Sequence, residues 1–255
     1  MVKGLDTFAE RFAGDEDQYV LIGGVAAYLL QEEAGLDPRA TQDLDIVLCI
    51  EALTPIFGQK IWDFIGEGGY EMRQAGEAPR CFYRFAKPAD DRFPKMLELF
   101  TREPDGLVLP DTATLTPVPM DGSVVSLSAI LLDEDYYDLI HTHKRMLNGV
   151  PIISEHALIP LKAYAWLDLR ARKDAGEQVD EKNIRKHRND VFRLYRLLAP
   201  DQKVALRDGP GDDLARFIEA QRGKLSADYL NTMGIHGETE DAILDTLAQI
   251  FGVAP

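Results

Sequence analysis

Two aspartates at alternate positions are the residues most able to do chemistry in this sequence. Asp43 and Asp45 open a segment, residues 43–50, that is otherwise wholly apolar. Side chains two positions apart on a strand project from one face, and a carboxylate buried in apolar surroundings needs a cation or a hydrogen-bonding partner. Carboxylate oxygens suit Mg²⁺, with substrate phosphates completing the coordination. The pair predicts a metal site that handles a nucleotide, with a strand-end or loop-capping role as the alternative.

A glycine pair precedes the aspartates. Gly23-Gly24 follows an expected strand at 19–22 and leads into an expected helix at 25–33. Glycine lets the backbone approach a phosphate closely, and the start of a helix offers free N–H groups to an anion. The pair therefore fits a phosphate-binding turn, and it fits an ordinary tight turn between a strand and a helix as well.

A third acid follows on a later expected strand, residues 95–101. Glu98 would share one face with Met96 and Phe100 while the leucines between them face the other way, so the acid has apolar neighbours in either case. Three carboxylates on adjacent strands would hold two divalent ions, which activate an attacking hydroxyl and neutralise a triphosphate. The alternative for Glu98 is an exposed position on an edge strand.

The elements that must position these residues suggest two domains in an α+β chain, 1–153 and 154–255. In the first, further helices are expected at 5–13 and 53–66, further strands at 81–86 and 124–132, and an irregular exposed stretch at 104–122. Asn148-Gly149 suits a type I′ turn and predicts a hairpin between strands 137–146 and 150–153. The second domain reads as helices at 155–173, 181–198, 212–221 and 238–250, with Ser154 and Asp180 as caps.

Composition limits the class of protein. The chain has 255 residues, a net charge of -15 and 45% hydrophobic residues, which argues for a globular protein and against a general basic surface for nucleic acid. No apolar run approaches the roughly 18 residues of a membrane span, and the start lacks a signal-peptide core, so we expect a cytoplasmic protein without membrane contact.

Cys49 and Cys81 read as small buried residues. His141 and His143 alternate on an expected strand, where a structural or surface role is favoured over metal binding.

Together the motifs resemble the nucleotidyltransferase fold of the polymerase-beta superfamily, with its glycine pair, Asp-x-Asp and later acidic strand residue. Residues 161–170 and 186–194 further resemble the AbiEii/AbiGii toxin-type nucleotidyltransferases, and the resemblance covers about residues 18–198. It implies a mixed-sheet nucleotidyltransferase domain followed by a helical domain. Arg193 departs from the family pattern, which has a second acid at that place.

The resemblance also implies a role for each site residue. Gly23 and Gly24 would hold the nucleotide phosphates, Asp43 and Asp45 would bind Mg²⁺, Glu98 would be the third acid, Arg39 and Lys162 would contact phosphates, and Asp190 would be the functional acid of the helical domain. Without the resemblance, Lys162 reads as a solvated helix lysine, and Asp190 fits a surface ion-pair network and a site role equally well.

The expected activity is the Mg²⁺-dependent transfer of an NMP from an NTP to an acceptor hydroxyl with release of pyrophosphate. The acceptor could be a tRNA 3′ end, a protein or a small molecule. The family alone suggests a toxin-antitoxin system with an antitoxin partner. The competing expectation is a noncatalytic module of the same fold that binds a nucleotide or a protein partner.

Overall fold

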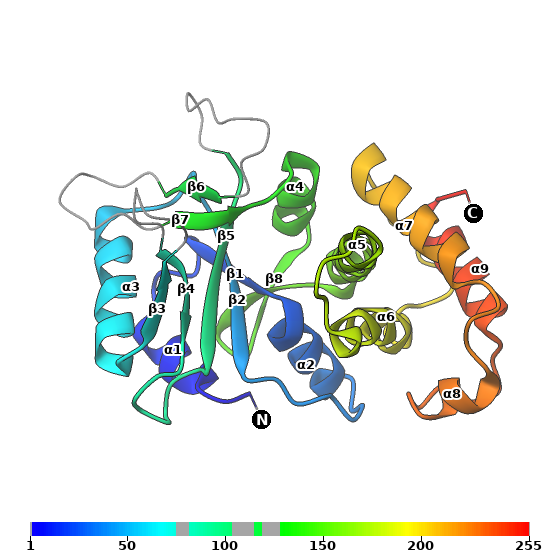
Figure 1. Ribbon diagram of the computed structural model, residues 1–255, viewed down its shortest axis with the longest axis horizontal. Coiled ribbons are helices and arrows are strands. Elements are labelled where there is room, and N and C mark those ends of the chain that lie inside the picture. The colour runs from blue at the N-terminus through cyan, green and yellow to red at the C-terminus, as the bar shows by residue number, and fades with distance from the viewer. Residues whose placement is uncertain (1, 75–81, 104–114, 119–127, 255) are drawn as a thin grey trace. The chain divides into compact units, whose positions relative to one another are not determined.

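The computed structural model describes residues 2–74, 82–103, 115–118 and 128–254 (Figure 1). Contacts within the chain divide it into two compact units. The first is Met1–Glu32 with Asp37–Ile153, and the second is Glu33–Leu36 with Ser154–Pro255. All described strands belong to the first unit. The α+β class predicted from the sequence is therefore confirmed.

The first unit is built on a mixed sheet. Along its main path the order is β3 (Glu71–Gln74), β4 (Phe82–Ala86), β5 (Met96–Thr101), β2 (Asp43–Leu48), β1 (Tyr19–Ile22), β9 (Val150–Ile153) and β8 (Lys144–Leu147). Off this path, β7 (Ser128–Leu131) pairs with β5 and with β6 (Leu115–Pro117). The central strand β2 is antiparallel to β1 and parallel to β5. It carries the two aspartates into the middle of the sheet.

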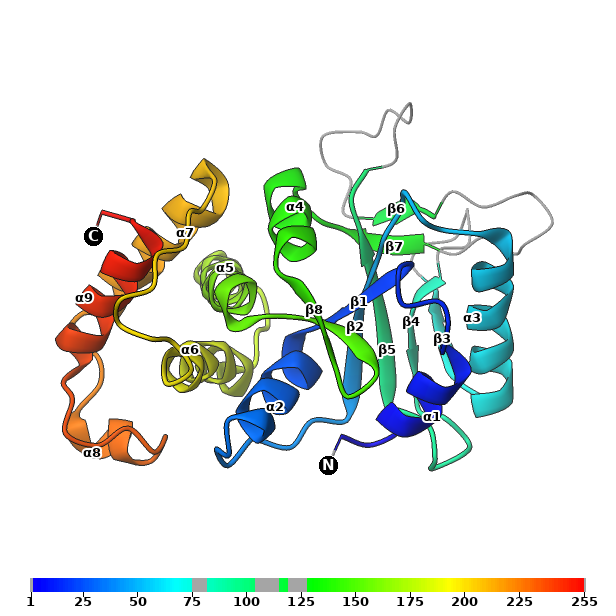
Figure 2. The ribbon, with the colours of Figure 1, turned by 180° about the vertical axis from the view of Figure 1, so that it is seen from behind.

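Four helices among the described residues accompany the sheet: α1 (Leu5–Arg11), α2 (Gly23–Glu33), α3 (Pro55–Gly68) and α4 (Glu134–Thr142). Figures 1 and 2 show α3 and α2 on opposite sides of the sheet. Thr54 caps α3 by accepting a hydrogen bond from the Phe57 N–H at 3.2 Å, and Gly69 ends the helix with a φ of 61°. None of the described helices in the chain is long and apolar enough to cross a lipid bilayer.

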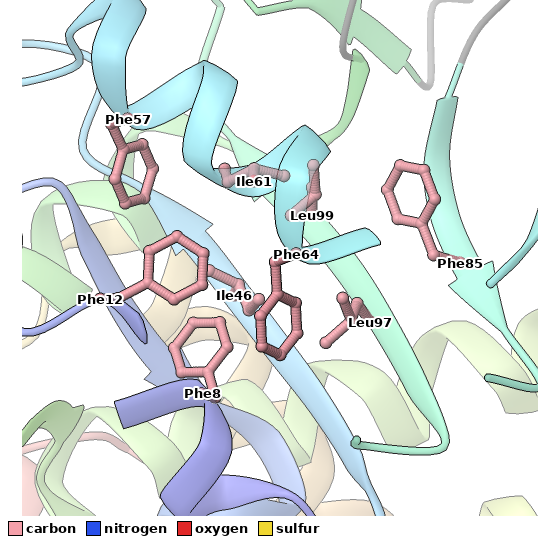
Figure 3. Close-up of a pocket in the computed structure, with 9 residues that line it drawn as sticks. All are labelled: Phe8, Phe12, Ile46, Phe57, Ile61, Phe64, Phe85, Leu97 and Leu99. Carbon is pink, nitrogen blue, oxygen red and sulfur yellow. The ribbon is translucent and has the colours of Figure 1, made fainter. Parts of the chain in front are cut away.

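An aromatic cluster fills the core between the sheet and α1 and α3 (Figure 3). It leaves a cavity of about 10 Å³ whose lining is entirely apolar: Phe8, Phe12, Ile46, Phe57, Ile61, Phe64, Phe85, Leu97 and Leu99. A space of that size is at the lower limit for a single water molecule, and its walls offer no hydrogen bond. It is a packing gap in the core. The side chains of Ile46, Leu97 and Phe85 line it and therefore lie on the same face of the sheet.

The second unit is helical. Its described helices are α5 (Glu155–Asp174), α6 (Glu181–Tyr195), α7 (Asp208–Gln221), α8 (Ala227–Asn231) and α9 (Glu240–Phe251), and α5 packs against both α6 and α7. The sequence predicted all of these except α8. Helix α7 begins four residues before the predicted start at 212, because Pro210 occupies the first turn, where proline is tolerated.

The predicted hairpin around Asn148-Gly149 is confirmed, with φ values of 50° and 78° at the two turn residues. Its first strand is shorter than predicted, because residues 134–142 form α4 instead. Asp133 caps that helix by accepting from the Asp135 N–H at 2.9 Å, and its buried side chains recur with helical spacing. The predicted strand positions of His141 and His143 are therefore wrong.

The remaining expectations concern the two cysteines and the segments 104–122 and 124–132. Cys49 is buried, as predicted, whereas Cys81 lies outside the described residues. Most of the stretch 104–122 and the first part of 124–132 lie outside them as well. Strand β3 is present beside β4, although the sequence analysis did not predict it.

Candidate functional site

The glycine pair forms the junction between β1 and α2. Gly23 has a φ of 66°, in the left-handed region that favours glycine. A Cβ atom built on Gly23 would overlap the Oδ2 atom of Asp45. Any side chain at position 23 would displace this carboxylate, so glycine is needed here for space as well as for backbone conformation.

Gly24 is also constrained by a neighbour. A Cβ atom on Gly24 would lie 2.6 Å from the Oγ1 atom of Thr41, which is itself buried. Thr41 belongs to the loop that leads into β2, two residues before Asp43. The first turn of α2 therefore packs closely against the chain that delivers both aspartates, and its N–H groups lie where a helix can bind an anion.

Asp43 and Asp45 share one face of β2, as predicted. Both are partly exposed, whereas Leu44 between them is fully buried. The register places Asp45 opposite Ile22 of β1 on one side and opposite Glu98 of β5 on the other. Side chains directly opposite one another in a sheet point to the same face, so Asp45 and Glu98 are neighbours.

Glu98 is only 8% exposed, and its partner is an arginine. The Nε and Nη2 atoms of Arg84 both donate to the Oε1 atom of Glu98. Arg84 lies directly opposite Glu98 in the antiparallel register of β4 and β5. A row of charges, Arg84, Glu98 and Asp45, thus runs across three adjacent strands on the face opposite the aromatic core.

Burial raises the pKa of Glu98 above its ordinary value, and the nearby charges of Asp45 and Asp43 raise it further. Arg84 acts in the opposite direction by favouring the carboxylate. Arg84 therefore offsets part of the repulsion that Glu98 experiences from the two aspartates.

The donor set fits one divalent cation bound by two carboxylates. Mg²⁺ is often held by one or two carboxylates, with phosphates and water supplying the other ligands, and Asp43 and Asp45 provide such a pair on one strand face. Among the described residues, no group of three or more His, Cys, Asp or Glu side chains lies in a metal-binding arrangement. Glu98 is paired with Arg84, and the two-ion set with Glu98 as its third acid remains a prediction.

Arg39 lies in the loop between α2 and β2. Its Nη1 atom donates to the carbonyl oxygen of Ala40 at 3.2 Å. A role for Arg39 in binding phosphate remains a prediction.

Lys162 and Asp190 lie in the helical unit, where they form an ion pair. The Nζ atom of Lys162 is 3.1 Å from the Oδ2 atom of Asp190, and each residue is 4% exposed. The pair links α5 to α6. Neither the solvated lysine nor the surface network considered from the sequence matches this burial, and the site roles of both residues remain predictions.

The sequence analysis missed Arg84. An arginine between Tyr83 and Phe85 on an expected strand is a signal of the same kind as Glu98, a charge in an apolar run. What the sequence could not supply was the pairing of β4 with β5, which brings the two charges together.

Comparison with known proteins gives structural similarity without a sequence match. No protein-family model matches the sequence, and no curated protein matches it. Among solved structures, the crystal structure of the Megavirus polyadenylate synthase is similar to 87% of this chain, with 10% identity and a TM-score of 0.40. The chain covers 36% of that protein.

Proposed function

We propose that this chain is a Mg²⁺-dependent nucleotidyltransferase that moves an NMP from an NTP to an acceptor hydroxyl. The first unit would be the nucleotidyltransferase domain and the second a helical domain. One observation carries the proposal: the Gly23 turn packs directly against the carboxylate of Asp45, which shares its strand face with Asp43. The candidate phosphate-binding turn and the candidate metal-binding pair would thereby be parts of one site.

Each residue then has a defined task. Asp43 and Asp45 would hold the divalent ion, which supplies charge neutralisation at the phosphates and a lower pKa for the attacking hydroxyl. The N–H groups of the first turn of α2, beginning at Gly23 and Gly24, would bind a phosphate oxygen. Rigid strands on both sides of Asp45 would hold the reacting groups in line.

The reaction forms one bond and breaks one. The acceptor oxygen attacks the α-phosphorus of the NTP, the bond from that phosphorus to the β-phosphate oxygen breaks, and pyrophosphate leaves with the electron pair. The acceptor proton passes to solvent. No covalent intermediate with the protein is needed, which agrees with a site made of carboxylates and backbone N–H groups.

The finer assignment rests on the sequence resemblance alone. We propose the AbiEii/AbiGii toxin-type family, with phosphate contacts from Arg39 and Lys162 and a functional role for Asp190. A macromolecular acceptor, such as a tRNA end or a protein, and an antitoxin partner belong to the same proposal.

A transfer assay tests the activity. The purified chain is incubated with each α-labelled NTP in turn, Mg²⁺, and either total RNA or a protein lysate. We expect label to be transferred to one acceptor class, and to be lost in Asp45→Asn and on chelation of Mg²⁺. Asp63→Asn on α3, an exposed aspartate that accepts a hydrogen bond from Gln59 at 2.8 Å, is the matched control and should keep full activity.

The alternative function is a noncatalytic module that binds a nucleotide. The same assay separates the two, because the module would bind NTP without labelling any acceptor. Nucleotide binding without transfer, under conditions in which a known transferase labels its acceptor, would rule out the enzyme.

A further inference from the structure

We infer that Arg84 is a phosphate-binding residue of this site and that Glu98 acts by positioning Arg84, not by ligating the metal. The inference rests on the proposed function. It reassigns Glu98, the third carboxylate of that proposal, from binding the metal to positioning a substrate-binding arginine. It follows from the row of charges across β4, β5 and β2.

The register brings Arg84 to the site. Arg84 is opposite Glu98, and Glu98 is opposite Asp45, so all three side chains point to one face. Neighbouring strands lie about 4.8 Å apart, which places the backbones of Arg84 and Asp45 about 10 Å from each other. Side chains reaching inward from both positions can hold one polyphosphate between them.

The hydrogen bonds of Arg84 leave it able to bind a ligand. A guanidinium group has five N–H donors in a planar fork. The Nε and Nη2 contacts to Glu98 fix the plane of the group, while Nη1 takes no part in them. The side chain is 30% exposed, against 11% for that of Glu98, so the arginine is the member of the pair more open to a ligand.

The same contacts commit part of Glu98 to Arg84. Its Oε1 atom accepts from two N–H groups of a cation, so Arg84 competes with a metal ion for the negative charge of this carboxylate. Both Asp43 and Asp45 are more exposed than Glu98, as metal ligands that also meet a substrate need to be. A buried carboxylate that fixes the fork of an arginine is a typical means of preorganising a phosphate contact.

Binding measurements test this without relying on turnover. Mn²⁺ is titrated with the full chain and followed by electron paramagnetic resonance, first alone and then with an α,β-methylene NTP analogue that cannot be cleaved. Arg84→Gln, Glu98→Gln, the double variant and Asp45→Asn are compared. Arg11→Gln, which removes one member of the Arg11–Glu67 pair elsewhere in the first unit, is the control.

We expect Arg84→Gln to weaken analogue binding by about 10- to 100-fold, the usual loss for a charge-assisted hydrogen bond, while Mn²⁺ binding is retained. Glu98→Gln should weaken analogue binding in the same way, and the double variant should be no worse than Arg84→Gln, because the two residues act as a unit. Asp45→Asn should lose Mn²⁺ itself. Arg84→Lys should not restore full affinity, since lysine lacks the fork.

Two results would overturn the inference. One is a loss of Mn²⁺ binding in Glu98→Gln as large as in Asp45→Asn, which would make Glu98 a metal ligand. The other is wild-type affinity for the analogue in Arg84→Gln. If Arg84→Gln does not fold because it strands the Glu98 charge, the double variant, which removes both charges, decides the second point.

Failure of the proposed function gives a different pattern. A wild-type chain that binds neither Mn²⁺ nor the analogue would overturn the function and the inference together. A wild-type chain that binds both, with Arg84→Gln unchanged, would overturn only the inference.

Discussion

The carboxylate of Asp45 occupies the space that a side chain at Gly23 would need. The two residues belong to antiparallel neighbours, since Ile22 at the end of β1 pairs with Asp45 of β2. The turn into α2 and the acidic pair are therefore built as a single unit. A substitution at Gly23 should therefore move the carboxylate of Asp45, and a substitution at Asp45 should alter the turn at Gly23.

Gly23→Ala should abolish nucleotide binding and destabilise the fold. Its methyl group would push the Asp45 carboxylate away, in addition to the cost of about 1–2 kcal/mol for a left-handed conformation. Gly35→Ala is a matched control, because Gly35 has a φ of 69° and nothing within 4 Å of an added Cβ. Urea unfolding and analogue binding measure both effects. Equal losses in the two variants would show that backbone strain, and not contact with Asp45, governs position 23.

Removing one member of the buried Lys162–Asp190 pair should be costly. Lys162→Met removes the nearer of the two cations beside the buried carboxylate of Asp190 and leaves Arg193 at 3.9 Å, which we expect to lower the free energy of unfolding by about 3–5 kcal/mol. Lys162→Met combined with Asp190→Leu should recover most of this loss, because no buried charge remains. Urea unfolding measures the stability of each variant.

A second ion pair joining the same two helices serves as the control. Lys173 of α5 pairs with Glu181 of α6, and their side chains are 37% and 49% exposed. Lys173→Met should cost no more than about 1 kcal/mol. A cost for Lys162→Met as small as that for Lys173→Met would contradict the buried-pair argument.

Stability should fall as the pH drops below about 6.5, the ordinary pKa of histidine. Burial lowers the pKa of His141 in the folded state, and its Nε2 atom has no hydrogen-bond partner among the described residues. Between the folded and unfolded pKa values the unfolded chain binds more protons, so stability rises with pH through this range. Urea unfolding at pH 7.5 and pH 5.5 should show the difference.

His141→Gln should reduce this pH dependence. His236→Gln, an exposed histidine whose Nδ1 atom lies 2.9 Å from the Oδ1 atom of Asn231, should leave it unchanged. If the free energy of unfolding of His141→Gln depends on pH as strongly as that of the wild type, other groups cause the loss of stability in acid.

A divalent cation should stabilise the wild-type chain. If Asp43 and Asp45 bind one ion in the folded state only, a concentration 100 times the Kd adds about 2.7 kcal/mol to the free energy of unfolding. Thermal unfolding with and without MnCl₂ should show a rise in Tm that a chelator reverses. Asp43→Asn and Asp45→Asn should each lose the rise, and its persistence in both variants would place the ion elsewhere.

Local sequence patterns predicted much of the sheet and of the site. The alternation of Asp43 and Asp45 with apolar residues placed both acids on one strand face, and Gly23-Gly24 marked the turn into a helix. These signals are local, because one strand or one turn contains all the information. The Asn148-Gly149 hairpin was predictable for the same reason.

Pairings between distant segments were not predictable. Arg84 meets Glu98 only because β4 pairs with β5, and Lys162 meets Asp190 only because α5 packs on α6. The strand predicted at 137–146 followed from the hairpin turn at Asn148-Gly149, yet the Asp133 cap and the helical spacing of the buried side chains favour α4 over residues 134–142.

The aromatic core also determines on which face of the sheet the acidic side chains lie. Ile46 and Leu97 point into the cluster of Phe8, Phe12 and Phe64, while their neighbours Asp45 and Glu98 point the other way. A slip of β2 by one residue would bury both aspartates among phenyl rings and turn Leu44 and Ile46 to the face that carries Glu98 and Arg84. Burial of the apolar face thus selects the strand register during folding, because the core packs fully only in the register that turns the acids away from it.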